Sequence, residues 1–204
     1  MLAFPVHVGL GKDCRHAVFF SNPQELIRDD LSGLIPGGEI QVGFIDFIGR
    51  FARMSFSDQV DHVVRIISKD YCVEDALLLG RSFGAWIILN ALLRLDVPFP
   101  GTVVLISSVL GLGGTGALGF AAPGSRTFWR EAESRTKAPA ERLLLFHGAD
   151  DEQCPLVHAK RLAELWHLEL IVFRGGGHGL GRPAFREELS QAIHGVWKCP
   201  GKRC

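Results

Sequence analysis

The chain has 204 residues, of which 47% are apolar and 22% are charged. These values are ordinary for a globular protein, and we expect a single domain over residues 1–198 with a short tail at 199–204. Lysine plus arginine balance aspartate plus glutamate at 22 each. This balance argues against nucleic acid or an anionic membrane as a partner.

Cysteine usage points to a reducing compartment. The five cysteines are scattered and lack the close pairing of a zinc site: Cys14, Cys72, Cys154, Cys199 and Cys204. The chain opens without a secretory signal, so we expect the cytoplasm. No metal and no cofactor are predicted.

A long uncharged stretch at 97–125 raises the question of a membrane span. Seven glycines and three prolines fall within it, which is unsuitable for a spanning helix. A buried strand followed by a glycine-rich loop explains the stretch better, and no membrane span is predicted.

Apolar runs alternate with amphipathic segments along the chain. The predicted strands are 2–8, 40–46, 75–80, 102–106, 142–147 and 168–173. The predicted helices are 22–34, one beginning at Ser57, 85–93, 126–138, 156–166 and 183–197. Pro98 and Pro100 are expected to break the chain before the fourth strand. Nearly wholly apolar strands that alternate with helices predict a mostly parallel six-stranded sheet in a three-layer α/β/α sandwich.

The third strand ends in Gly80-Arg81-Ser82-Phe83-Gly84, and a helix pattern follows at once. Strand, tight turn and helix are the context of a G-x-S-x-G nucleophile elbow. We therefore predict Ser82 as a nucleophile. Its main-chain neighbour Phe83 would donate an N–H to an oxyanion, and Leu10, in the loop after the first strand, would supply the second donor.

A serine nucleophile needs a histidine base and a carboxylate that orients it. His178 follows the last strand in a glycine-rich loop, which has neither the lysine nor the spacing of a phosphate-binding P-loop. The acid is expected after the fifth strand, where Asp150, Asp151 and Glu152 are adjacent. An acid in such a loop can also simply cap the next helix, so the residues alone leave this choice open.

Taken together, these motifs resemble the α/β-hydrolase superfamily. They are Asp46–Arg50, Gly80–Gly84, Asp151 before Cys154-Pro155, and Gly177-His178. The likeness implies strands in the superfamily order 4-3-5-6-7-8, without the first two strands and without a cap domain. It also favours Asp151 as the acid, since Asp151 lies three residues after Gly148 and four before Pro155, as in that family.

Within the superfamily, the chain looks most like the small dienelactone-hydrolase-like group. Its nearest branch resembles testis-expressed hydrolase-like proteins and a related domain of a histone-acetyltransferase complex subunit. The residues concerned are His7, Gly9, Gly11, Asp13, His16, Gly80–Ser82 and Asp151–Cys154. Val8 separates His7 from Gly9, where the family has His-Gly. Dienelactone hydrolases use cysteine, so a serine here favours an esterase-like activity.

The sequence therefore predicts a serine hydrolase that cleaves a small-molecule carboxylic ester or thioester with Ser82, Asp151 and His178. The alternative is a catalytically weak hydrolase fold that binds a protein partner. The irregular His-Val-Gly segment and the likeness to a complex subunit motivate that alternative. A peptidase is less favoured, because the chain shows neither a propeller nor a cap to select peptides.

Overall fold

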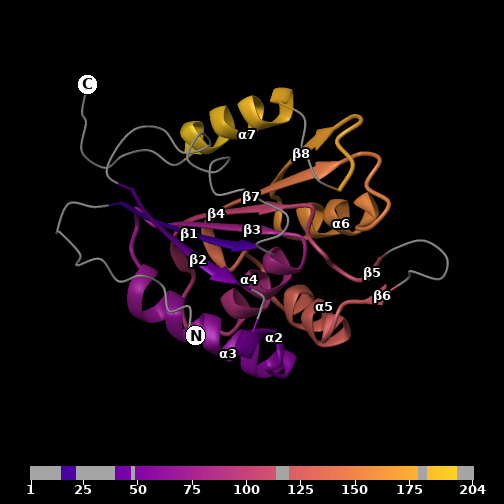
Figure 1. The fold of residues 1–204 in the computed structure, drawn as a ribbon. Helices are drawn as coiled ribbons and strands as arrows, with labels where there is room; N and C mark the ends of the chain where they lie inside the picture. The colour runs from indigo at the N-terminus through magenta and orange to yellow at the C-terminus, as the bar shows by residue number, and fades with distance from the viewer. Residues whose placement is uncertain (1–14, 22–39, 47–48, 114–119, 179–182, 197–204) are drawn as a thin grey trace.

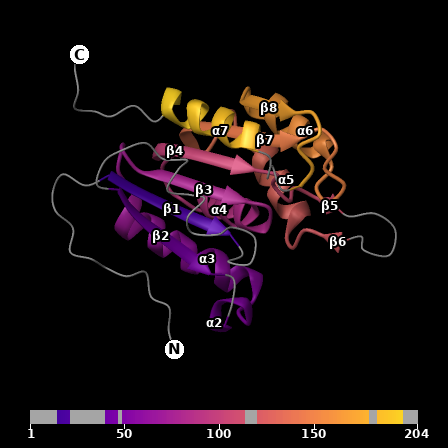
Figure 2. The same ribbon diagram turned by 45° about the horizontal axis from the view of Figure 1, so that its top comes forward.

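A parallel sheet forms the centre of the molecule in the computed structural model, which describes residues 15–21, 40–46, 49–113, 120–178 and 183–196. The described strands pair in the order β2-β1-β3-β4-β7-β8, and every pair is parallel. Their bounds are β1 (Arg15–Ser21), β2 (Ile40–Asp46), β3 (Leu77–Arg81), β4 (Phe99–Ile106), β7 (Ala140–Gly148) and β8 (Glu169–Phe173). Figures 1 and 2 show their arrows pointing the same way, so their carboxyl ends share one edge.

Helices cover both faces of this sheet. The described helices are α2 (Gly49–Ala52), α3 (Phe56–Ile66) with the π-helical turn η1 (Ile67–Tyr71), α4 (Phe83–Leu93), α5 (Ser125–Ser134), α6 (Leu156–Trp166) and α7 (Pro183–Val196). In Figure 1, α7 lies above the sheet and α3, α4 and α5 lie below it. A two-stranded hairpin, β5 (Leu112–Gly113) with β6 (Phe120–Ala121), lies outside the main sheet.

Side chains alternate between the two faces of the central strands. Leu77 and Leu79 of β3 belong to a buried cluster with Leu189 and Ile193 of α7. Leu78, between them, belongs to the larger cluster on the opposite face, which includes α3, α4, α5 and α6. The period of two places one apolar set in each layer, and both sets are buried.

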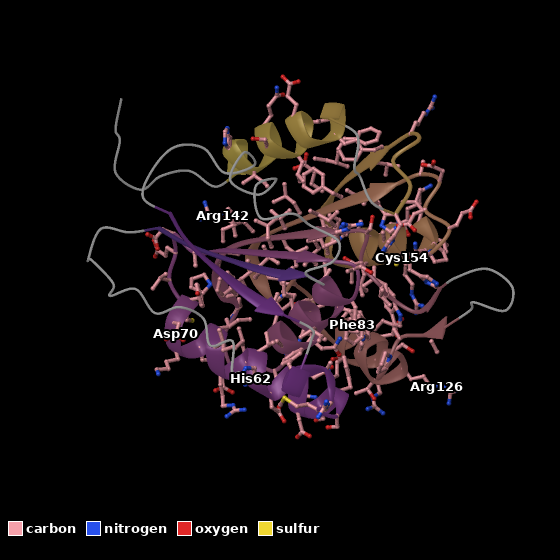
Figure 3. All side chains as sticks on the ribbon, viewed as in Figure 1. His62, Asp70, Phe83, Arg126, Arg142 and Cys154 are labelled. Atoms are coloured by element: carbon pink, nitrogen blue, oxygen red, sulfur yellow. The ribbon has the colours of Figure 1, made fainter. Side chains whose placement is uncertain are left out.

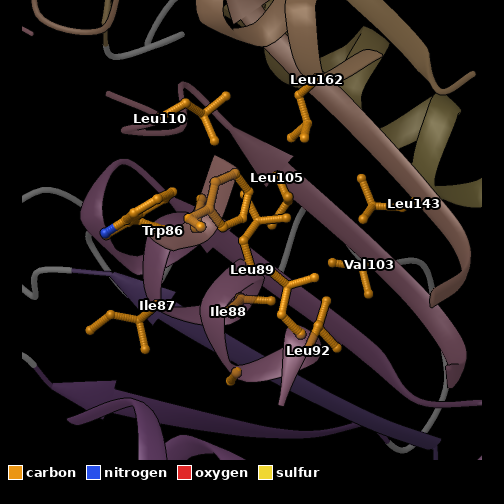
Figure 4. Close-up of a cluster of buried hydrophobic side chains, with 14 of the residues drawn as sticks. Trp86, Ile87, Ile88, Leu89, Leu92, Val103, Leu105, Leu110, Leu143 and Leu162 are labelled. Atoms are coloured by element: carbon orange, nitrogen blue, oxygen red, sulfur yellow. The ribbon is translucent and has the colours of Figure 1, made fainter. Parts of the chain in front are cut away.

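Helix α4 is the centre of the larger cluster. Its residues from Gly84 to Leu93 are buried except Asn90, so it is apolar around its whole circumference. Figure 4 shows Trp86, Leu89 and Leu92 packed among side chains of β4, β7 and α6. Burial of each such side chain contributes about 1.5–3 kcal/mol relative to exposure. This packing fixes the helix that begins directly after Ser82.

The structure confirms the predicted parallel α/β architecture and the strand order implied by the resemblance. The strand predicted at 40–46 and the helix predicted at 156–166 have the observed bounds. The strand predicted at 2–8 and the helix predicted at 22–34 lie outside the described residues. The sequence reading missed β1, whose apolar run is only Ala17–Phe20 after the polar pair Arg15-His16.

The predicted break at Pro98 and Pro100 was wrong, because β4 already begins at Phe99. The pairing of β4 with β7 shifts register between Phe99 and Thr102, and this irregularity accommodates a proline that has no N–H to donate. The uncharged stretch 97–125 contains β4 and the hairpin strands. No helix among the described residues has the length and apolar character that a membrane crossing requires.

Candidate active site

Ser82 occupies the sharp turn between β3 and α4. Its backbone has φ 52° and ψ −121°, a conformation that costs a non-glycine residue energy and is typical of functional turns. The turn is tight because β3 and α4 nearly touch. A Cβ on Gly80 would lie 2.6 Å from Ile88 Cδ1 and 2.7 Å from Ala85 Cα. Only glycine fits at position 80 without displacing the helix.

Hydrogen bonds to the neighbouring strand hold the strained backbone of Ser82. Its N–H donates to the Ile106 carbonyl at 2.9 Å. Its carbonyl accepts from the N–H groups of Trp86 and Val109, each at 3.3 Å. These bonds connect Ser82 to β4 and to the first turn of α4, so the core packing of both elements fixes its position.

Asp151 lies in the loop after β7, and its side chain is fully buried. Oδ1 accepts the backbone N–H groups of Gln153 at 2.9 Å and Cys154 at 2.8 Å. A buried carboxylate is stable only when such donors replace the water it has lost. The two bonds fix the carboxylate within its own loop.

The two neighbouring acids have other surroundings. Asp150 Oδ1 accepts the N–H of Gly177 at 3.0 Å. This bond connects the loop after β7, called the acid loop here, to the segment that carries His178. Glu152 is exposed. The backbones of the two loops approach closely beside this bond, because a Cβ on Gly148 would lie 2.2 Å from the Gly177 carbonyl oxygen.

His178 bridges the serine and the acid. Its Nδ1 lies 3.0 Å from Asp151 Oδ2 and 3.2 Å from Oδ1, and its Nε2 lies 3.0 Å from Ser82 Oγ. An ionised carboxylate only accepts hydrogen bonds, so Nδ1 carries the proton and Nε2 is left to accept the hydroxyl proton. The arrangement can withdraw a proton from Ser82 and stabilise the resulting imidazolium.

Competing effects set the charge of Asp151. Burial alone raises the pKa of its carboxyl group. The hydrogen bonds from His178 and the Cys154 N–H, together with the nearby imidazoles of His178 and His147, outweigh burial and hold the pKa below its usual value. The carboxylate is therefore ionised at neutral pH, the state in which it can orient His178.

The sequence reading assigned His147 only to the end of a strand, but the structure places its ring beside the acid. The ring is 1% exposed, and Nε2 lies 2.6 Å from the Cys154 carbonyl oxygen and 3.6 Å from Asp151 Oδ2. Burial lowers the pKa of His147 more than the Cys154 carbonyl and the Asp151 charge raise it. A neutral ring therefore donates to the carbonyl. Its position four residues before Asp151 is the signal that could have revealed this contact.

The structure describes one of the two predicted oxyanion donors, Phe83. Phe83 is the first residue of α4, so its N–H lies at the positive end of the helix dipole, directly after Ser82. In Figure 3, Phe83 and Cys154 both lie on the side toward which the strand arrows point. Leu10 lies outside the described residues.

Among the described residues, one group of three potential metal ligands occurs at this site, formed by Asp151, Cys154 and His178. Its sulfur was not predicted as part of the site. Cys154 and His178 are 24 residues apart, so a sequence search for closely spaced ligands does not bring them together.

Comparison with known proteins identifies the fold. No family model matches the chain, and no curated protein matches it. Among solved structures, a putative hydrolase from Agrobacterium vitis is similar with a TM-score of 0.66 at 17% identity, over 90% of this chain and 88% of that one.

Two further solved structures give the same result. Mouse alpha/beta hydrolase domain-containing protein 10 has a TM-score of 0.67 at 15% identity, over 89% of this chain and 88% of that one. A monoacylglycerol lipase from Paleococcus ferrophilus has a TM-score of 0.65 at 16% identity, over 87% and 91%. The chain therefore has the α/β-hydrolase fold.

Proposed function

We propose that this protein, which has the α/β-hydrolase fold, is a serine hydrolase that cleaves a carboxylic ester or thioester through an acyl-enzyme. The observation that carries the proposal is the 3.0 Å separation between His178 Nε2 and Ser82 Oγ, with Asp151 on the other ring nitrogen. Proteins similar in fold include one named as a monoacylglycerol lipase and one named as an esterase domain, which supports ester chemistry.

In the first half-reaction, Ser82 Oγ attacks the carbonyl carbon as His178 Nε2 takes the hydroxyl proton. The carboxylate of Asp151 stabilises the imidazolium that forms. The Phe83 N–H donates to the developing oxyanion at the amino end of α4. Collapse of the tetrahedral intermediate breaks the bond to the leaving group, which receives the proton from His178.

In the second half-reaction, water replaces the leaving group. His178 takes a proton from the water as its oxygen attacks the acyl carbon, and it returns that proton to Ser82 as the acid product departs. The half-buried rings of Phe83 and Phe56 have centroids 6.2 Å apart, so an apolar surface begins at the residue that follows Ser82, which suits an acyl group.

Hydrolysis of a panel of p-nitrophenyl esters and acyl thioesters of increasing chain length tests the proposal. We expect turnover by the natural chain and a fall to background for Ser82→Ala, a change that reaches about a millionfold in well-studied serine hydrolases. Ser134→Ala is a matched control, because its hydroxyl only donates to the Glu131 carbonyl within α5. Absence of turnover across the panel would contradict the proposal and favour the fold as a protein-binding module.

A further inference from the structure

The acid and the histidine of the site have a third close neighbour, the thiol of Cys154. A ring nitrogen of His178, a carboxylate oxygen of Asp151 and Cys154 Sγ all lie within 4.8 Å of one another. Cys154 is 3% exposed and forms no disulfide with another described residue. The proposed acyl transfer has no step that uses this sulfur. A thiol, an imidazole and a carboxylate at such short range are together a donor set for a metal ion.

The separation of the nitrogen and oxygen atoms already suits a tetrahedral ion. Bonds of about 2.0–2.1 Å from zinc to nitrogen and oxygen place two such ligands about 3.3 Å apart at a tetrahedral angle. His178 Nδ1 lies 3.0 and 3.2 Å from the two oxygens of Asp151. An ion that replaces the Nδ1 proton therefore needs shifts of only a few tenths of an ångström from these two side chains.

The sulfur requires a modest additional movement. A thiolate bound to zinc at about 2.3 Å lies about 3.6 Å from the other tetrahedral ligands. In the structure, Cys154 Sγ lies within 4.8 Å of the nitrogen and oxygen atoms. The backbone of Cys154 is fixed by the hydrogen bond from its N–H to Asp151 Oδ1 at 2.8 Å. The movement must therefore come from the side chain, whose sulfur turns about the Cα–Cβ bond.

The surroundings of the cluster also suit a cation. Asp151 is ionised and held by two backbone donors, and His147 Nε2 lies 3.6 Å from its Oδ2. Such outer contacts orient the ligands of a metal and raise its affinity. His178 keeps 10% of its side chain exposed, so solvent reaches one of the three ligands. One thiolate, one imidazole and one carboxylate form a mixed sulfur, nitrogen and oxygen set that matches Zn²⁺ better than Mg²⁺ or Ca²⁺.

We infer that Asp151, Cys154 and His178 form a binding site for a divalent transition metal, with Zn²⁺ as the best match, and that occupancy of this site blocks the reaction of Ser82. Binding forms bonds to Sγ, Nδ1 and a carboxylate oxygen. The thiol proton and the Nδ1 proton pass to the buffer. A metal bound to His178 Nδ1 makes it harder for Nε2 to take the proton of Ser82. The carboxylate of Asp151, bound to the same metal, can then no longer stabilise the imidazolium. The blocking effect rests on the proposed function, whereas the binding does not.

Metal binding is measured first, without reference to activity. Cobalt is added to the natural chain and to Ser82→Ala, and zinc affinity is measured by competition with a chromogenic chelator. We expect a sulfur-to-cobalt charge-transfer band in both proteins, one equivalent of metal, and loss of the band in Cys154→Ser. The zinc affinity of Cys154→Ser should fall at least about tenfold. Loss of a residue that only contacts a metal ligand already costs about 10–100-fold, and Cys154 is itself a ligand.

Two controls keep this test specific. Cys72→Ser changes the exposed cysteine at the end of η1, away from the site, and should leave the band and the zinc affinity as they are. His178→Ala should weaken zinc binding as Cys154→Ser does. A band that survives Cys154→Ser, or zinc affinity that neither Cys154→Ser nor His178→Ala changes, would overturn the inference. Circular dichroism of each variant establishes that it is folded.

Inhibition is measured second, as the ratio of ester hydrolysis with and without zinc. The natural chain should lose activity on titration with zinc and regain it with a chelator. Cys154→Ser should need at least about tenfold more zinc for half-inhibition, whatever its own basal rate. Metal binding without any hydrolysis would refute the proposed function and support the metal site. Hydrolysis that zinc does not inhibit would refute the blocking effect.

Discussion

Ser82 and His178 meet at 3.0 Å, but the two halves of the site are held in place by different forces. The serine half depends on close packing, because α4 is buried around its circumference and Gly80 leaves no room for a methyl group. The histidine half depends on polar contacts between two loops, through Asp150, Asp151 and the Gly148–Gly177 approach. Changes to the packing around Ser82 should therefore act mainly on stability, and changes to the loop contacts around His178 mainly on activity.

Among changes that leave Ser82 in place, the largest expected effect is that of Asp151→Asn. The amide can present an N–H to His178 Nδ1, which moves the ring proton to Nε2, where it can no longer accept the proton of Ser82. A loss of kcat of about 10⁴ is expected by analogy with this change in other serine hydrolases. Steady-state ester hydrolysis measures it.

Asp150→Asn is the matched control, because it makes the same charge change one residue away. Its oxygen can still accept the Gly177 N–H, so its activity should fall far less. Equal losses in the two variants would show that charge at this edge, and not orientation of His178, governs the rate.

Gly148→Ala should have the next largest effect. The added methyl would meet the Gly177 carbonyl oxygen at 2.2 Å and push the His178 loop away from the acid loop. A displacement of about 1 Å costs about a hundredfold in rate. Kinetics and thermal unfolding on the same samples should show a fall in Tm, because the clash is with backbone, and a larger loss of kcat than Gly80→Ala gives for a comparable fall in Tm. A large fall in Tm with unchanged kcat would contradict the division between the halves.

Gly80→Ala tests the packed half. Its methyl would overlap Ile88 Cδ1 and Ala85 Cα, and overpacking of this kind costs about 1–3 kcal/mol. For a chain of this size, Tm should fall by roughly 2–12 °C. Gly195→Ala in α7 is the control, since no atom lies within 4 Å of its added methyl and Tm should hold or rise slightly.

The smallest effect concerns acid stability. The pKa of His147 is lower in the folded chain than in the unfolded chain, where it is about 6.5, so the unfolded state binds more protons as pH falls. The free energy of unfolding should therefore decrease from pH 7 to pH 5, and His147→Gln should reduce that decrease. The pKa of His62 is also lowered, by burial and the charge of Arg65, and it contributes a separate part. Urea unfolding at both pH values measures the difference.

The sequence predicted the packed half of the site better than the loop half. Strand, elbow and helix around Ser82 follow from a local apolar pattern with glycines, and these elements lie where they were expected. The role of Asp150 depends on a contact across 27 residues, which no local pattern encodes. The four-residue spacing of His147 and Asp151 was visible in the sequence but was not used. The acid was chosen from three adjacent candidates by family resemblance and not by chemistry.

The sequence did not predict β1 or the start of β4, and both failures have a physical cause. In β1, backbone pairing to two neighbouring strands compensates for a short apolar run preceded by Arg15 and His16, so the sequence signal is weak. Pro100 is normally read as a strand breaker, yet the register shift in β4 accommodates it. Pairing between strands decided both cases, and pairing is not visible in a single segment.

Reaction with a fluorophosphonate, followed by mass spectrometry of the resulting peptides, tests the central claim most directly. The account predicts one adduct, located on Ser82, with no adduct in Ser82→Ala and strongly slowed labelling in His178→Ala. An adduct on another residue, or labelling at an unchanged rate after either substitution, would contradict the assignment of Ser82 as a nucleophile activated by His178.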